Sequence, residues 1–359
     1  MSSDHSETVD EKNPRITRRR ALTLMGAGGV ALVAAGMRGI WRPGQSQAAG
    51  GEASAVANRS GWPGKVVVVN SPHAVNSSGE VRDEVVTKMV ETAVCRLSGE
   101  KDPRAAWRRF FDRDDVIGIK VNCLGAPGTR TDPSVAMAAA RGLQGADIPA
   151  RNIIIYDRQS GELNAAAYPI NDKPNGIRCF GTDSVGYDEE ITTAGEAASC
   201  FSRIVSEICT ALLNMPILKD HDLVGITVSL KNHFGSINNP NKMHINGGAP
   251  YVADVNLAPQ ISKKQRLIIC DALRVVYDGG PTFKANTTTA YGAILAATDP
   301  VALDRVGWDI IEELRRRAGL PSLTAAGRPP RYIAVAADAQ HRLGIADPHR
   351  IQRISVALG

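Results

Sequence analysis

The stretch that decides the fold consists of VIGIKV (116–121) and NIIIY (152–156), which flank the segment TDPSVAMAAARGL (131–143). The two flanking segments are short and rich in β-branched residues, which is typical of buried strands. The middle segment places Asp132 directly before Pro133, as at the N-terminus of a helix. Buried strands separated by a helix predict an α/β domain built on a mostly parallel sheet.

The same alternation continues along the chain on both sides of this stretch. Further strands are expected at residues 65–70, 223–230, 266–270, 293–297 and 351–358. Further helices are expected at residues 81–97, 201–213, 299–317 and 332–342, with a long loop at 157–176. We therefore expect one α/β domain over residues 65–359, with helices on both faces of the sheet. An arrangement in two lobes, divided near residues 200–220, is the alternative.

The N-terminal segment has the pattern of an export signal. The sequence TRRRAL (17–22) leads into a weakly apolar run (21–37), and the small residues SQAA (46–49) follow. A basic segment, a short apolar segment and a small-residue exit are typical of export signals, and paired arginines indicate the twin-arginine route. We expect an export signal at 1–48, a linker at 49–64, and a periplasmic mature protein that has the twin-arginine translocase as a partner.

Two fates of this signal stay open. Small residues at Ala48 and Ala49 favour cleavage there, whereas the alternative is retention of the segment as a membrane anchor. The apolar run is 17 residues long and is interrupted by glycines, and a helical span needs about 20 apolar residues. We therefore expect no stable membrane span in the mature protein.

The composition excludes several classes of protein. The chain has 359 residues, of which 43% are hydrophobic and 22% charged, so it is neither a collagen, a coiled coil, a disordered chain nor a polytopic membrane protein. The first 48 residues carry a formal charge of +3 out of the total of +5. The remaining chain has no strongly basic character, and we expect no nucleic-acid partner.

The six cysteines do not form a metal or cluster signature. No two of them stand in a C-x-x-C pair, so neither a zinc ribbon nor an iron–sulfur cluster is expected. Some could pair in an exported protein. Their apolar neighbours, as around Cys270, favour buried free thiols for most of them.

The segment from Lys219 to His244 is the densest in groups that carry chemistry. It holds three of the seven histidines, His221, His233 and His244, and it places Lys231 and Asn232 after an expected strand. Ligands of parallel sheets bind beyond the carboxyl ends of the strands. Histidine can exchange a proton or bind a metal near neutral pH, and a lysine there can bind an anion or act as a nucleophile. The alternative is that these are satisfied structural residues.

A second candidate follows the expected strand 116–121. The strand carries Lys120 near its end, and Asn122, Thr129 and Arg130 follow in a loop bent by Gly and Pro. The backbone N–H groups that open the next helix, together with the arginine, can receive an anion. The alternative is a plain strand-to-helix turn that Asp132 caps.

A third candidate is Asp271, at the end of the expected strand 266–270. A carboxylate there can orient a histidine or bind a cation, and a purely structural carboxylate is the alternative. Asp299, by contrast, is expected to cap a helix because Pro300 follows it.

Seven segments together resemble the family known as domain of unknown function 362. They are VIGIKVN (116–122), TDP (131–133), PILKDH (216–221), VSLKNHFG (228–235), DAL (271–273), DGGPT (278–282) and TDPVALD (298–304). The resemblance implies an α/β domain in a family whose members are often exported. Some members carry ferredoxin-type cysteine clusters, which this chain lacks. The family name supplies no reaction.

A more distant resemblance concerns the lactate racemase family, which uses a nickel-pincer nucleotide. That family has a His-x3-Gly-x5-Lys segment, and His221, Gly225 and Lys231 keep its spacing. The resemblance implies that His221 is an acid–base residue, Lys231 a cofactor anchor and His244 a metal ligand, with His233 or His244 as the later histidine.

The same comparison shows departures. Ser229 and Leu230 stand where that family has glycines, and Asp157 or Arg158 stands where it has another catalytic histidine. The expected cofactor is therefore open: a metal, a nickel-pincer-like nucleotide, or neither.

Two functions follow. The first is an exported enzyme acting on a small anionic substrate with histidine acid–base chemistry, either isomerase- or racemase-like or an oxidoreductase with a bound cofactor. Lys120 and Arg130 would then hold the anion, His221 would move a proton, Lys231 would anchor charge and Asp271 would orient a partner. The second is a periplasmic protein that binds a ligand or cofactor without turnover.

Overall fold

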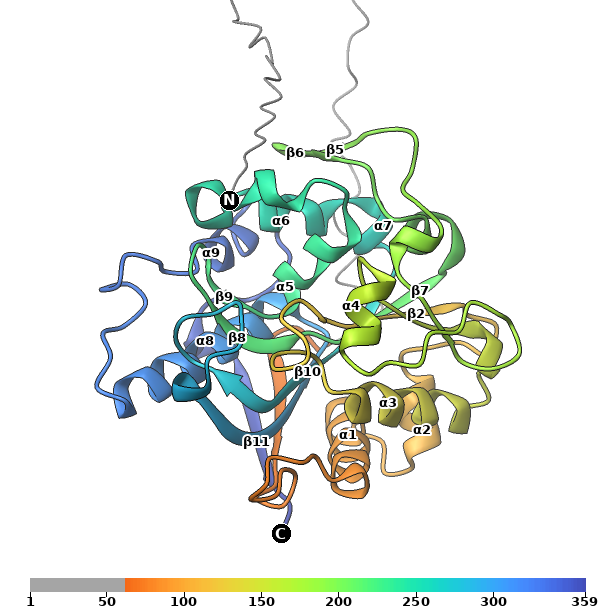
Figure 1. Ribbon diagram of the computed structural model, residues 1–359, viewed down its shortest axis with the longest axis horizontal. Coiled ribbons are helices and arrows are strands. Elements are labelled where there is room, and N and C mark those ends of the chain that lie inside the picture. The colour runs from red at the N-terminus through yellow and green to blue at the C-terminus, as the bar shows by residue number, and fades with distance from the viewer. Residues whose placement is uncertain (1–61) are drawn as a thin grey trace, which may run out of the picture. The chain divides into compact units, whose positions relative to one another are not determined.

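A ten-stranded sheet runs through the computed structural model, which describes residues 62–359 (Figure 1). The main path of the sheet has the order β12-β1-β11-β10-β7-β2-β3-β4, and β8 pairs with β10 and β9. The strands are β1 Lys65–Asn70, β2 Ile117–Lys120, β3 Ile153–Tyr156, β4 Arg178–Cys179, β7 Ala211–Asn214, β8 Ile217–His221, β9 Gly225–Thr227, β10 Gln265–Val276, β11 Thr288–Ala297 and β12 Gln352–Ala357. A separate antiparallel pair is formed by β5 Thr192–Ala194 and β6 Ala197–Ser199.

Most strand pairs in the large sheet are parallel, as the sequence predicts. The strands β10, β7, β2, β3 and β4 form a continuous parallel series, and β1 is parallel to β12. The exception on the main path is β11, which runs antiparallel to both β1 and β10.

Helices cover both faces of the sheet, which confirms the expected layers. One face packs against α1 Asp83–Ser98, α2 Pro103–Arg108 and α3 Pro133–Gly145. The other face packs against α5 Ser229–Asn232, α6 Tyr251–Leu257, α7 Pro259–Ser262, α8 Pro300–Arg317 and α9 Tyr332–Ala336. Because side chains alternate along a strand, β1 sends Val67 and Val69 into the first core and Val66 and Val68 into the second.

Two expected helix caps are present. The Asp132 carboxylate accepts a hydrogen bond from the Ser134 N–H at 3.1 Å, and the Asp299 carboxylate accepts one from the Ala302 N–H at 2.8 Å. Each cap satisfies an N–H group that lacks a partner within its helix. Both caps precede a proline at the start of the helix.

The prediction of a helix at residues 201–213 is wrong. The chain instead makes a short π-helical turn at Ile204–Ile208 and then enters β7, between β2 and β10. A short apolar run fits both helical and strand periods, and pairing with two neighbouring strands decides in favour of the strand. At Gly118 of β2 a Cβ atom would lie 2.9 Å from Cys209 Sγ, so this glycine gives room to the segment before β7.

Three further expectations need correction. The expected loop 157–176 contains a short helix, α4 Ser160–Ala165. The expected strand 223–230 is only β9, so Lys231 lies on the short helix α5 rather than after a strand. The expected strand 266–270 continues to Val276 as β10, so Asp271 lies in the middle of a strand and not at its end.

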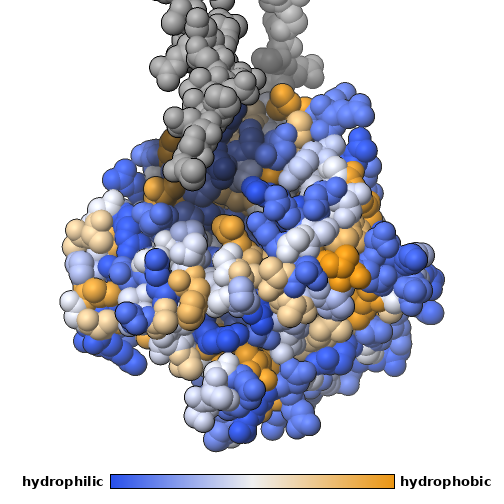
Figure 2. Space-filling model, viewed as in Figure 1, coloured by the Kyte–Doolittle hydropathy of each residue, from blue (hydrophilic) through white to orange (hydrophobic). Residues whose placement is uncertain are grey.

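The expected export signal 1–48 and nearly all of the linker 49–64 lie outside the described residues. None of the helices within residues 62–359 is both long and apolar enough to cross a membrane. On the face shown in Figure 2, hydrophilic residues predominate and hydrophobic ones are scattered in small groups.

Candidate functional site

A cavity of about 320 Å³ lies beyond the carboxyl ends of β2 and β3. The elements around it are those two strands, β8, β9, α5 and the segment Pro240–Gly248. Its polar side chains come from Lys120, Asn122, Asp157, Arg158, Glu162, Lys219, His221, Thr227, Lys231, Asn232, Asn241 and His244. The structure therefore brings together six of the ten predicted site residues: Lys120, Asn122, His221, Lys231, Asn232 and His244.

A buried ion pair occupies one side of the cavity. Lys120 Nζ lies 2.7 Å from Asp157 Oδ1, and the two side chains are 1% and 5% exposed. The other Asp157 oxygen accepts a hydrogen bond from the Cys123 N–H at 2.7 Å. A Cβ atom at position 235 would lie 2.6 Å from Lys120 Nζ, so Gly235 lets the chain after α5 approach the pair. The charge of Lys120 is thus compensated within the protein.

Lys231, unlike Lys120, has no carboxylate partner among the described residues that line the cavity. Its side chain is buried, and its ammonium group lies 5.1 Å from the centroid of the Phe234 ring. Within residues 62–359 it donates no hydrogen bond. Burial, with Lys219 as the next cause, lowers the pKa of Lys231 to about 7. Because Lys231 lines the cavity and donates no hydrogen bond to a described residue, its ammonium group is available to a ligand or to water there.

Lys219 adds a second ammonium group to the same cavity. Its Nζ donates to the Leu124 carbonyl at 2.7 Å, and its side chain is almost fully buried. Burial lowers its pKa to about 7 as well. The two lysines therefore place positive charge where water is largely excluded.

Two neutral polar atoms in the cavity wall also lack partners. The Asn122 Oδ1 and Thr227 Oγ1 atoms are buried, and no described residue forms a hydrogen bond with them. The Asn122 amide donates to Asn232 Oδ1 at 3.2 Å, which fixes its orientation. Buried polar atoms in native proteins are nearly always paired, so a ligand or water is expected to meet these two atoms.

Two histidine rings stack at the cavity wall. The ring centroids of His221 and His244 are 5.3 Å apart, with an interplanar angle of 26°. His244 Nδ1 lies 3.0 Å from the Pro240 carbonyl, to which it donates. Its Nε2 atom therefore carries a free lone pair in the neutral form.

His221 is the more buried of the two rings. Burial, followed by the charges of Lys231 and other neighbours, lowers its pKa to about 2, so the ring is neutral at physiological pH. Its Nδ1 atom lies 3.2 Å from the Leu223 N–H and 3.0 Å from Asp222 Oδ1. The ring is held on its Nδ1 side.

His233, although next to α5, does not line the cavity. It is fully buried, and its Nε2 donates to Gln265 Oε1 at 2.7 Å, while Nδ1 lies 3.4 Å from Ser236 Oγ. Burial lowers its pKa to about 4. Both ring nitrogens are used inside the protein, which is the pattern of a structural histidine.

Thr129, Arg130 and Asp271 also lie apart from the cavity. They surround a separate space of about 10 Å³, which is roughly the size that one water needs. The Asp271 carboxylate accepts hydrogen bonds from the N–H groups of Asp132 at 2.7 Å and Leu273 at 2.8 Å. This carboxylate therefore joins β10 to the start of α3.

Two cavity residues were not predicted as site residues: Lys219, which begins the segment densest in groups that carry chemistry, and Thr227. Asp157 and Arg158 were named only as departures from a family pattern. Lys219 lies on β8, a strand that was not predicted because charged residues occupy it. Residues two apart on a strand point to the same side. The two-residue spacing of Lys219 and His221 was the available signal.

No three His, Cys, Asp or Glu side chains in the described part of the chain form a group that could hold a metal ion. The three residues that the lactate racemase resemblance selects, His221, Lys231 and His244, line one cavity.

Comparisons with known proteins give distant matches. No curated protein matches the chain in sequence. Among solved structures, the chain is similar to a protein from Thermotoga maritima (11% identity, TM-score 0.41, covering 66% of this chain and 59% of that one). It is also similar to the lactate racemase apoprotein from Thermoanaerobacterium thermosaccharolyticum (12% identity, TM-score 0.38, 69% and 57%). The chain spans less than two thirds of either structure.

The family match is more extensive. The model of the domain of unknown function (DUF362) matches residues 117–309, which is more than half of the chain. The matched region runs from β2 into α8 and includes Lys120, His221, Lys231 and His244. The protein belongs to the DUF362 family.

Proposed function

We propose that the protein is an exported enzyme that binds a small anionic substrate in the cavity beyond β2 and β3. The ammonium group of Lys231, which faces the cavity and donates no hydrogen bond to a described residue, is the observation that carries this proposal. An anion placed between Lys231 and Lys219 would supply the missing partner. The unpaired Asn122 Oδ1 and Thr227 Oγ1 atoms would orient the hydroxyl or amine groups of the same substrate.

The charges around the cavity favour an anion over a cation. Asp157 compensates Lys120, which leaves Lys219, Lys231 and Arg158 against Glu162. A site lined by one sign of charge attracts ligands of the other sign.

His221 is the group that would move a proton. Burial is the largest cause of its low pKa, and the charges of Lys231 and Lys219 lower this pKa further. A bound anion offsets these two charges and raises the pKa of His221 from its value in the free protein. The reaction classes that fit are an isomerase- or racemase-like proton transfer, or an oxidation with a bound cofactor.

A bound nucleotide cofactor is the alternative occupant of this anion site. Lys231 and Lys219 would then hold its phosphate in place of a substrate anion, and His244 Nε2 would offer a nitrogen ligand if the cofactor carried a metal. A nickel-pincer-like nucleotide would supply hydride or proton chemistry at the substrate carbon.

The test begins with the full chain, purified from the exported pool without added metal, and with mass and elemental analysis of what it carries. Calorimetric titration with inorganic phosphate and DL-lactate then measures anion binding. We expect Lys231→Ala to weaken binding at least about tenfold, as the loss of a charged hydrogen bond does. Lys173→Ala, an exposed lysine in a loop, should leave it unchanged.

Turnover separates the two functions that the sequence left open. The His221→Ala variant should still bind the anion but should no longer convert it. NMR of the ligand measures this conversion. Binding without conversion by the wild-type chain would instead favour the periplasmic binding protein. If neither anion binds and no organic mass is present, the proposed anion site is wrong.

Export rests on the N-terminal pattern alone. A triple variant in which Arg18, Arg19 and Arg20 are each changed to Lys should stay in the cytoplasm, because paired arginines define the twin-arginine route. Cell fractionation with an antibody against the chain measures this, and periplasmic protein in equal amount would contradict the assignment.

A further inference from the structure

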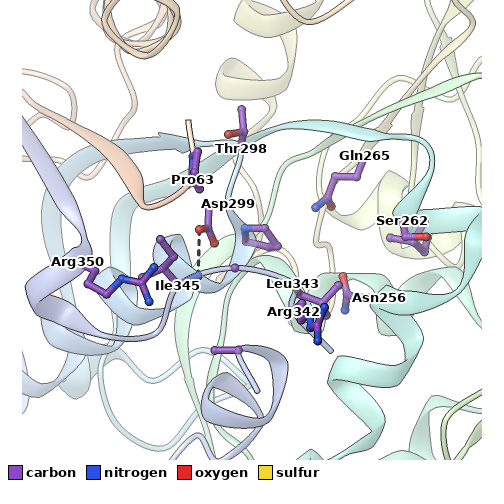
Figure 3. Close-up of a pocket in the computed structure, with 14 residues that line it drawn as sticks. Pro63, Asn256, Ser262, Gln265, Thr298, Asp299, Arg342, Leu343, Ile345 and Arg350 are labelled. Carbon is purple, nitrogen blue, oxygen red and sulfur yellow. Dashed lines mark hydrogen bonds between the residues drawn. The ribbon is translucent and has the colours of Figure 1, made fainter. Parts of the chain in front are cut away.

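A second cavity, of about 360 Å³, lies where the start of β10 and the end of β11 meet the C-terminal segment 337–350 (Figure 3). It is as large as the first cavity, and its size is within the range of small-molecule sites. None of the residues that the sequence predicted for a site lines it.

The most buried polar side chain of this cavity has an unused acceptor. Asn256 is 3% exposed, and its Nδ2 group donates to the carbonyls of Leu230 and Val252, both at 2.8 Å. Its Oδ1 atom has no partner within residues 62–359. A 180° flip of the Asn256 amide would place Oδ1 next to two carbonyl oxygens, which are also acceptors. The orientation of the amide is therefore fixed, and the cavity wall contains an unpaired acceptor.

Two arginines line the exposed part of the same cavity. Figure 3 shows Arg350 on the side of Asp299 and Arg342 toward Asn256. Arg342 Nε donates to the Ala339 carbonyl at 2.8 Å, and the terminal nitrogens of both guanidinium groups have no partner in the described part of the chain. Guanidinium groups of this kind bind carboxylates in a bidentate manner.

Asp299 does not neutralise these arginines. It is the one carboxylate among the described lining residues. Its oxygens accept hydrogen bonds from three backbone N–H groups, those of Gly64 at 2.9 Å, Ala302 at 2.8 Å and Ile345 at 3.1 Å. The mouth of the cavity therefore keeps a net positive charge.

The rest of the wall is largely apolar. Pro63, Ile261, Pro300, Leu343 and Ile345 contribute to it. A ligand that fills this space needs an apolar body.

We propose that this cavity is a second ligand site, specific for a small amphiphilic acid. Its carboxylate binds Arg350, its apolar body packs against the proline and aliphatic side chains, and a hydroxyl group donates to Asn256 Oδ1 on the other side of the cavity. This second cavity is separate from the first cavity, beyond β2 and β3, because neither Lys231 nor His221 lines the second cavity.

The probe for the test is 3-(4-hydroxyphenyl)propionate, titrated into the full chain by calorimetry. Two matched compounds test the contribution of each polar group of the probe. The compound 3-phenylpropionate lacks the hydroxyl donor, and 4-ethylphenol lacks the carboxylate. We expect each to bind at least about fivefold more weakly than the probe, since each leaves one polar partner unmet. Equal affinity of all three compounds would overturn the proposal.

Variants locate the site. Arg350→Gln should weaken binding of the probe about tenfold, and Ala337→Leu, which fills part of the cavity, should abolish binding. The exposed Arg151→Gln should have no effect. Arg350 is outside the hydrophobic core, whereas Ala337 packs against it, so circular dichroism checks that each variant folds.

The anion cavity supplies the last control. Lys231→Ala should leave binding of the probe unchanged, and Arg350→Gln should leave phosphate binding unchanged. Loss of probe binding in Lys231→Ala would place the probe in the first cavity and refute the second site. This outcome is distinct from failure of the proposed function, which concerns phosphate and lactate.

Discussion

Lys120 Nζ and Asp157 Oδ1 are 2.7 Å apart in a pair that is almost completely buried. Lys120 also donates to the Val121 carbonyl at 2.6 Å, and Asp157 accepts from two backbone N–H groups, so both partners are well satisfied. Such a pair positions the ends of β2 and β3 and does not leave Lys120 free for a ligand. The sequence predicts anion binding at Lys120, whereas the function that we propose places the anion at Lys231 and Lys219.

Removing one partner of this pair should therefore destabilise the fold. Asp157→Asn leaves the Lys120 charge buried and uncompensated, which costs about 3–5 kcal/mol of unfolding free energy. Urea denaturation followed by circular dichroism measures this. The exposed Asp172→Asn should change the unfolding free energy by less than about 0.5 kcal/mol. A loss below about 1 kcal/mol in Asp157→Asn would contradict the role of the pair.

Anion binding in the first cavity should be linked to proton uptake. Burial lowers the pKa values of Lys219 and Lys231 to about 7, so above that pH the free protein holds part of both groups in the neutral form. A bound anion favours the charged form and raises both pKa values. Phosphate should therefore bind with net proton uptake at about pH 8.5 and with much less at about pH 5.5.

Calorimetry in Tris and HEPES buffers, which differ in ionisation enthalpy, gives the number of protons taken up. Phosphate itself releases protons near neutral pH, so the Lys231→Ala variant is the reference. Identical uptake by the wild type and the variant would show that Lys231 does not titrate with the ligand.

The same lysine makes stability depend on pH. The pKa of Lys231 is about 7 in the folded chain and about 10.4 in an unfolded one. Between these values the unfolded chain binds more protons, so stability rises with pH, and below about pH 7 the cost of the buried charge is complete. Lys231→Met should therefore stabilise the protein at about pH 6 and progressively less toward about pH 10. Urea denaturation in anion-poor buffer measures both values, and a pH-independent effect would contradict the assignment.

The sequence predicts the parts of this fold that depend on local pattern. The strands at Ile117–Lys120 and Ile153–Tyr156 and the helix capped by Asp132 follow from runs of β-branched residues and from an Asp-Pro pair. The strand β8 does not, because Lys219 and Asp220 interrupt its apolar run. Lys219 is buried beside the cavity, and Asp220 is buried in an ion pair with Arg328, and both environments are set by tertiary structure.

The sequence also predicts part of the candidate site. His221, Lys231 and His244 come together because a short turn and α5 fold back over the strand ends. Asp271 was misplaced because its strand continues for five residues beyond it, a length that depends on pairing with β11. Its contact with Asp132, 139 residues away in sequence, is likewise set by tertiary structure.

Gln265 provides the last prediction, because one amide oxygen serves two buried donors. Its Oε1 accepts from His233 Nε2 at 2.7 Å and from Asn214 Nδ2 at 2.9 Å. Gln265→Leu leaves the His233 donor without a partner and weakens the bonding of Asn214, which still donates to the Ser229 carbonyl. Each lost acceptor costs about 1–3 kcal/mol when the donor stays buried, so we expect about 2–4 kcal/mol in urea denaturation. Gln144→Leu, on the exposed side of α3, is the matched control and should stay within about 0.5 kcal/mol of the wild type. A variant of Gln265 as stable as the control would mean that water replaces the amide and would contradict a structural role for this hydrogen bond.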